Sequence, residues 1–103
     1  MPSIYFRRGL ILVDRGDLQG ARKEFQAALD EAARHQYVEA REEMTVKSEN
    51  ALGVVAWTGG EYDEALRWLR KAEEEQNRFG GNWVPELTAN RQRLEGIISQ
   101  QHR

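Results

Sequence analysis

One short pattern occurs twice in this chain, and it constrains the fold more than any other feature. A glycine, an acidic residue, an apolar residue and, three positions further, an alanine stand at residues 16–21 and again at residues 60–65, 44 residues later. Each copy lies between segments whose apolar residues have helical spacing. The glycine suits the left-handed residue that ends one helix, and the acidic residue, Asp17 or Glu61, suits the cap of the next. A turn repeated at a fixed period predicts a chain of stacked helical hairpins.

The composition excludes several classes of protein. A chain of 103 residues is expected to form one domain with a modest core. Its formal net charge of −2 gives no global basic field for nucleic acid, and the lack of cysteine excludes disulfides and thiolate zinc sites. No apolar run approaches the ~18 residues of a membrane span, and residues 1–5 lack the pattern of a secretory signal. The expected location is cytoplasmic.

Hydrophobic spacing predicts five helices and no strand, so the expected fold class is all-α. Ser3 is the expected N-cap of the first helix, and Pro85 is acceptable in the first turn of the last one. No strong breaker stands between His35 and Val38, so the boundary between the second and third helices is the least marked. The helices are expected at residues 4–14, 18–35, 37–58, 61–79 and about 83–101.

The helices differ in how their apolar residues are arranged. The second and fourth each have one apolar face, with residues recurring at i, i+3 and i+4. The first helix is apolar on nearly all sides, with Arg7 and Arg8 as its strongly polar positions, so it is expected to need burial on more than one side. The expected buried faces are Leu18, Ala21, Phe25, Ala28, Leu29 and Ala32 in the second helix and Tyr62, Ala65, Leu66, Leu69, Ala72 and Phe79 in the fourth.

No arrangement of residues points to catalysis. The two histidines, His35 and His102, stand near a helix boundary and at the C-terminus, where histidine is usually a surface residue. The carboxylates at residues 42–43 and 73–75 alternate with basic residues, which is typical of a solvated helix face rather than of an acid–base pair. The glycine pairs are not followed by the Gly-Lys-Ser/Thr of a phosphate loop. The sequence predicts no enzyme, no cofactor and no metal.

Small and bulky residues recur at matching places in the two predicted hairpins. They are Tyr5, Gly9, Leu12, Ala21, Phe25 and Ala28 in the first hairpin and Leu52, Gly53, Ala56, Ala65, Leu69 and Ala72 in the second. With these residues the hairpins resemble tetratricopeptide repeats, whose pattern is W-x2-L-G-x2-Y followed by A-x3-F, a later alanine and a proline. The small residues let paired helices approach closely, and Phe25 and Leu69 fill the space beside them.

The resemblance covers residues 4–79 and has departures. Arg8 replaces the leucine of the first repeat, Glu49 the tryptophan of the second, and Ala33 and Asn77 the final proline. The period of 44 residues exceeds the usual 34, and such longer repeats resemble those of kinesin light chains and of bacterial regulatory proteins. The resemblance implies a single α-solenoid domain over residues 1–103. It would comprise hairpins at about 3–36 and 37–79 and a capping helix at about 83–101.

The resemblance also implies a binding surface. In such arrays the first helix of each hairpin lines a concave groove that holds a peptide or helix of another protein. Phe6, Leu10 and Ala51 stand where a receptor for acidic C-termini would carry lysine and asparagine, so that ligand is not expected. The groove is expected to be apolar, with a hydrogen-bonding side chain from Asn50. The expected partner-binding residues are Phe6, Leu10, Val13, Asn50, Val54 and Trp57, with rim contacts from Lys47 and Arg91.

The sequence leaves alternatives open. Trp57 is either an anchor for the partner or a residue that packs the adjoining helices, because both roles are common for tryptophan at helical spacing. The surplus apolar residues Phe6, Leu10 and Val13 could instead be covered by a second copy in a homodimer, since two hairpins are few for a stacked array. RNA is the weakest candidate, because the grouping of Arg91, Arg93 and Trp83 carries too little positive charge.

Overall fold

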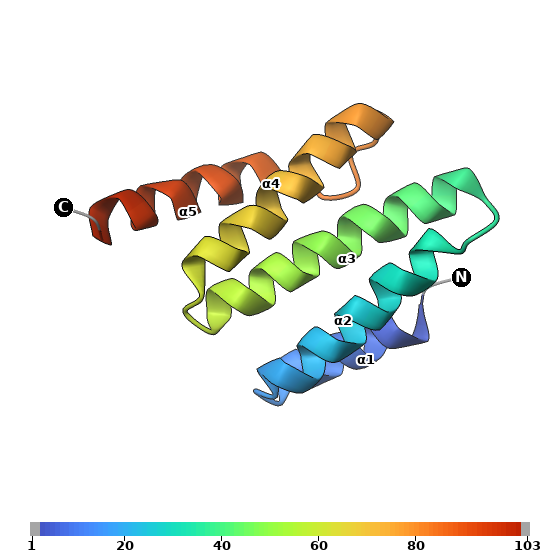
Figure 1. Ribbon diagram of the computed structural model, residues 1–103, viewed down its shortest axis with the longest axis horizontal. Helices are drawn as coiled ribbons and strands as arrows, with labels where there is room; N and C mark the ends of the chain where they lie inside the picture. The colour runs from blue at the N-terminus through green and yellow to red at the C-terminus, as the bar shows by residue number, and fades with distance from the viewer. Residues whose placement is uncertain (1–2, 102–103) are drawn as a thin grey trace.

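Five helices follow one another in a row, each packed mainly against its neighbours in sequence (Figure 1). The computed structural model describes residues 3–101 and contains α1 (Ile4–Asp14), α2 (Leu18–Ala33), α3 (Val38–Thr58), α4 (Tyr62–Phe79) and α5 (Leu87–Gln101). The packed pairs are α1 with α2, α2 with α3, α3 with α4 and α4 with α5. Stacking of this kind, with no strand in the described part, confirms the predicted all-α solenoid.

The ends of the helices follow the expected local chemistry with one exception. The Ser3 hydroxyl accepts a hydrogen bond from the Phe6 N–H at 3.3 Å, and Asp17 Oδ1 accepts one from the Gly20 N–H at 2.9 Å. Gly16 has φ of +82°, the left-handed conformation that glycine adopts without strain. The expectation that Glu61 caps α4 with its side chain is wrong, because that carboxylate turns instead toward Arg22 on α2, at 3.3 Å.

Besides the start of α4, which is Tyr62 rather than residue 61, three helix boundaries differ from the predicted ones. α2 ends at Ala33 rather than near His35, and α3 begins at Val38 because Tyr37 has an extended backbone. α5 begins at Leu87 rather than near residue 83, so Pro85 lies in the turn before the helix and not in its first turn. The residue before a proline is disfavoured in the helical conformation, and here that residue, Val84, is held through its backbone by the side chain of Gln76.

Two apolar clusters hold the row of helices together. Gly9 of α1 faces the ring of Phe25 on α2, and Gly53 of α3 faces Leu69 on α4, so each glycine allows the helices of its pair to approach closely. The first cluster joins α1, α2 and α3 around Ala21, Phe25, Ala51, Leu52 and Val55. The second joins α3, α4 and α5 around Val46, Ala56, Ala65, Leu69, Ala72, Val84, Leu87 and Leu94.

The first helix is covered on one side only. Its sole buried residue is Gly9, while Ile4, Tyr5, Leu10 and Ile11 are exposed. The apolar character of α1 is therefore not satisfied within residues 3–101. Of the two histidines, His35 is half-exposed and its Nδ1 accepts a hydrogen bond from the Tyr37 N–H, whereas His102 lies outside the described residues. Among the described helices, none combines the length and apolar character that crossing a bilayer requires.

Candidate partner-binding groove

An apolar groove of about 330 Å³ opens between α1, α3 and the segment that leads into α5. This volume is at the lower end of the range for ligand sites in proteins, and it suits a few side chains rather than a whole folded element. Two charged residues, Lys47 and Glu86, are part of its lining. The lining residues are Phe6, Leu10, Val13, Phe25, Lys47, Asn50, Ala51, Val54, Val55, Trp83, Val84 and Glu86.

The first wall of the groove comes from α1. The ring of Phe6 packs against the ring of Phe25 at a centroid distance of 5.3 Å, and Phe25 lies over Gly9 in the core beneath the wall. Phe6 and Val13 are half-buried, whereas Leu10 is 48 % exposed. The α1 wall is thus anchored in the core through Phe25 and presents Leu10 to the open groove.

The second wall comes from α3. Val54 lines the groove and is 39 % exposed. Lys47 also lines it, and the Lys47 Nζ lies 2.6 Å from the carboxylate of Glu43, one turn earlier on the same helix. Asn50 supplies an amide, whose Oδ1 is buried and has no hydrogen-bond partner among residues 3–101. An unsatisfied acceptor of this kind is costly unless a donor reaches it. The α3 wall therefore combines an aliphatic surface with one amide oxygen that lacks a donor.

The third wall is a short irregular segment between α4 and α5. Gly80 ends α4 in the left-handed conformation, and Trp83 then packs against the ring of Phe79 at 6.4 Å. The side chain of Gln76 fixes the next residue, because its Nε2 donates to the Val84 carbonyl at 3.1 Å and its Oε1 accepts from the Val84 N–H at 2.9 Å. Both bonds are buried, so they hold Trp83 and Val84 against the groove.

The structure brings together most of the predicted groove residues. Phe6, Leu10 and Val13 from α1 meet Lys47, Asn50 and Val54 from α3 in one lining. Trp57 does not line the groove. It lies nearly two turns beyond Asn50 and packs, half-buried, against the cluster that joins α3, α4 and α5. For Trp57 the structure therefore favours the alternative in which it packs the adjoining helices.

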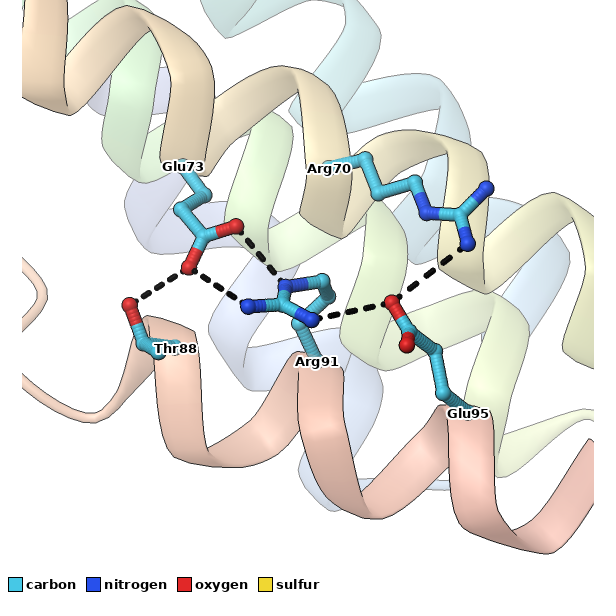
Figure 2. Close-up of polar contacts among 5 residues, drawn as sticks. All are labelled: Arg70, Glu73, Thr88, Arg91 and Glu95. Atoms are coloured by element: carbon cyan, nitrogen blue, oxygen red, sulfur yellow. Dashed lines mark hydrogen bonds and ion pairs between the residues drawn. The ribbon is translucent and has the colours of Figure 1, made fainter.

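Arg91, predicted at the rim, is held by acidic partners away from the groove. Its Nε lies 2.8 Å from Glu73 Oε1 on α4, and its Nη1 lies 3.0 Å from Glu95 Oε1 on α5 (Figure 2). The same oxygen of Glu95 also contacts Arg70 of α4. Thr88 donates a further hydrogen bond to Glu73. The guanidinium of Arg91 lowers the pKa of both Glu73 and Glu95, because it stabilises their charged forms. Arg91 thus ties α5 to α4.

Sequence reasoning missed the wall made by Trp83, Val84 and Glu86. The available signal was a pair of apolar residues enclosed between Gly81 and Pro85, where an unpacked loop would be polar. These residues are held in the groove wall by Gln76, which binds the backbone of Val84. Gln76 stands eight residues before Val84, and in the sequence it resembles an ordinary surface residue of a charged helix. Within residues 3–101 no group of three or more metal-ligating side chains gathers.

The comparisons with known proteins agree with this architecture. Residues 2–35 match the family model described as a tetratricopeptide repeat, which spans α1 and α2. Comparisons of the chain with curated proteins and with solved structures give no match. The first hairpin, α1 with α2, is therefore similar to a tetratricopeptide repeat, a kind of repeat that generally mediates contacts between proteins.

Proposed function

We propose that the chain is a non-catalytic protein-interaction module that binds an extended, apolar and uncharged segment of a partner protein in the groove. The observation that carries this proposal is the pair Leu10 and Val54, two aliphatic side chains on facing walls that no described residue covers. Burial of apolar surface is the main driving force of association. Of the two charged lining residues, Lys47 is already neutralised by Glu43, so the groove offers little to an acidic ligand.

Asn50 favours an extended segment over a helix as the occupant. The N–H groups inside a helix are bonded within that helix, whereas an extended segment has free backbone donors. The Asn50 Oδ1 is buried and lacks a donor among the described residues, and rotation of the amide toward the groove would let it accept one from such a segment. The apolar walls then select the side chains of the bound segment, and the amide of Asn50 fixes the position of its backbone.

Replacing Leu10 with glutamate is expected to weaken binding to the groove by at least about tenfold, since a partner would then bury an unpaired carboxylate. The measurement starts from a phage-displayed peptide library selected on the immobilised protein. The selected peptides are then synthesised and titrated by fluorescence anisotropy. We expect their shared core to be apolar and uncharged.

Asn50→Leu should cost about fivefold in affinity for the same peptides, the equivalent of one hydrogen bond.

Ile11→Glu is the matched control for this experiment. Ile11 is adjacent to Leu10 on the same helix and equally exposed, at 48 %, but it lies outside the groove. Ile11→Glu should therefore leave the affinity for the selected peptides unchanged, although it introduces the same charge into the same helix. Equal binding of the selected peptides to the wild-type protein and to Leu10→Glu would contradict the proposed function.

A further inference from the structure

A second surface runs along the outer edge of α1, away from the groove. Ile4, Arg8, Ile11 and Arg15 are spaced by four, three and four residues, which places them in one stripe on the helix. All four are exposed, Ile4 by 63 %. We call these four residues the α1 edge. An alternation of isoleucine and arginine on an open helix face is a defined chemical surface rather than a scattered set of residues.

The corresponding stripe of α3 shows that a stripe at these positions can pack against another helix. Ser48, Leu52 and Val55 stand 44 residues after Ile4, Arg8 and Ile11, and all three are buried. Leu52 and Val55 belong to the cluster around Ala21 and Phe25 of α2. The stripe on α3 is thus covered by the helix that precedes it. The same stripe on α1 has the geometry to receive a helix and is bare among the described residues.

Charge distinguishes the α1 edge from its counterpart on α3. Arg8 and Arg15, with Arg7 beside them, are all exposed, and none forms an ion pair within residues 3–101. The arginines on the other helices that do form ion pairs, Arg22, Arg70 and Arg91, contact glutamates. A second copy of α1 would bring together two edges of the same positive sign, with no carboxylate on either edge, and like charges across an interface are unfavourable.

From this complementarity we propose that the α1 edge binds an acidic amphipathic helix of a partner protein. Apolar side chains of that helix cover Ile4 and Ile11, and flanking aspartates or glutamates pair with Arg8 and Arg15. Arginine favours such contacts because its planar guanidinium donates to both oxygens of a carboxylate. This surface is distinct from the groove, so one chain can hold two partner segments at once.

Designed peptides test the α1 edge directly. The probe is a hydrocarbon-stapled helix of about five turns, with leucines spaced to meet both isoleucines and glutamates at the intervening positions. The comparison peptide carries lysines in place of those glutamates. Fluorescence anisotropy should show binding of the glutamate peptide at least about tenfold tighter than that of the lysine peptide. The affinity should fall as salt rises from about 50 to 500 mM, because exposed charges are screened.

Charge reversal makes the outcome decisive. In the double variant Arg8→Glu with Arg15→Glu the preference should invert, so that the lysine peptide binds more tightly, a result that a merely misfolded variant would not give. Ile11→Glu should abolish binding of the glutamate peptide, and Leu10→Glu should leave it intact. Failure of both peptides to bind, an unchanged preference after charge reversal, or loss of binding in Leu10→Glu would each overturn the proposal. So would light scattering that shows a dimer dispersed by Ile11→Glu, since the edge would then hold a second copy.

Discussion

Replacing Phe25 with alanine is expected to lower the free energy of unfolding by about 3–5 kcal/mol, the usual cost of truncating a buried aromatic ring. Phe25 is almost completely buried and belongs to the apolar cluster that joins the first three helices. Its ring lies over Gly9 of α1, packs against Phe6, and shares a cluster with Leu52 of α3. Small domains have only about 5–15 kcal/mol of stability in total, so this loss is large.

The same substitution should separate the unfolding of the first hairpin from that of the rest. Trp57 packs against the second cluster, whereas Trp68 packs against the first cluster and Trp83 lines the groove with Phe25. Trp68→Phe and Trp83→Phe therefore keep Trp57 as the single fluorescent reporter. In urea, far-ultraviolet circular dichroism of Phe25→Ala in this background should change before the fluorescence of Trp57 does, whereas the two transitions of the background protein should coincide. Phe25→Leu, which keeps most of the buried volume, should cost only about 1 kcal/mol. A loss below about 1 kcal/mol in Phe25→Ala would show that this ring does not hold the array together.

The second large effect concerns Glu49, a buried acid on α3. Its side chain is 1 % exposed, and Lys71 of α4 approaches one of its oxygens at 3.5 Å. Its other oxygen, Oε1, and Oε2 of Glu75 on α4 are both buried without a hydrogen-bond partner among residues 3–101. Burial, together with a hydrogen bond that only the protonated acid donates to Glu75, raises the pKa of Glu49 to about 8, although Lys71 acts in the opposite direction.

Stability should consequently fall as the pH rises from about 5 to about 9. In this range the folded chain holds a proton on Glu49 that the unfolded chain has released, so the free energy of unfolding decreases with pH and levels off above the folded pKa. Each pKa unit corresponds to about 1.4 kcal/mol, and the expected loss is on the order of a few kcal/mol. For a domain of this size, the melting temperature should drop by roughly 10–20 °C. Differential scanning calorimetry across this pH range measures the change.

Glu49→Gln provides the control for the pH dependence. Glutamine resembles the protonated acid in shape and can donate to Glu75, but it does not titrate. The variant should melt near the wild-type temperature at pH 5 and above it at pH 9. If the wild-type and variant proteins showed parallel pH profiles, Glu49 would not be the titrating group.

Much of the fold was predictable because its local signals agree with one another. The bounds of α1 match the prediction, since Ser3 caps its start and Gly16 ends the turn that follows it. The recurring glycines at 9 and 53 marked the close helix contacts, and the expected buried faces of α2 and α4 contain Phe25 and Leu69, which fill the space beside them. In such places one residue determines the local geometry.

The parts that were not predictable depend on contacts between distant residues. The third wall of the groove exists because Gln76 binds the backbone of Val84, an interaction that helical spacing does not reveal. Trp57 was placed in the groove because it shares the face of Val54, but the second apolar cluster covers that end of α3. The burial of Glu49 was hidden by its charge, although the repeat pattern sets it where a tryptophan is usual.

The central claim, that the groove holds a segment of another protein, can be tested most directly by photocrosslinking from inside the groove. The photoreactive residue p-benzoylphenylalanine replaces Val54, and in a control protein it replaces Tyr37, which is exposed but does not line the groove. After irradiation in cell lysate, mass spectrometry identifies the attached peptides. We predict that position 54 captures a recurrent, apolar and uncharged segment, that position 37 does not, and that Leu10→Glu abolishes the capture. The same peptides from both positions, or capture that persists in Leu10→Glu, would contradict the claim.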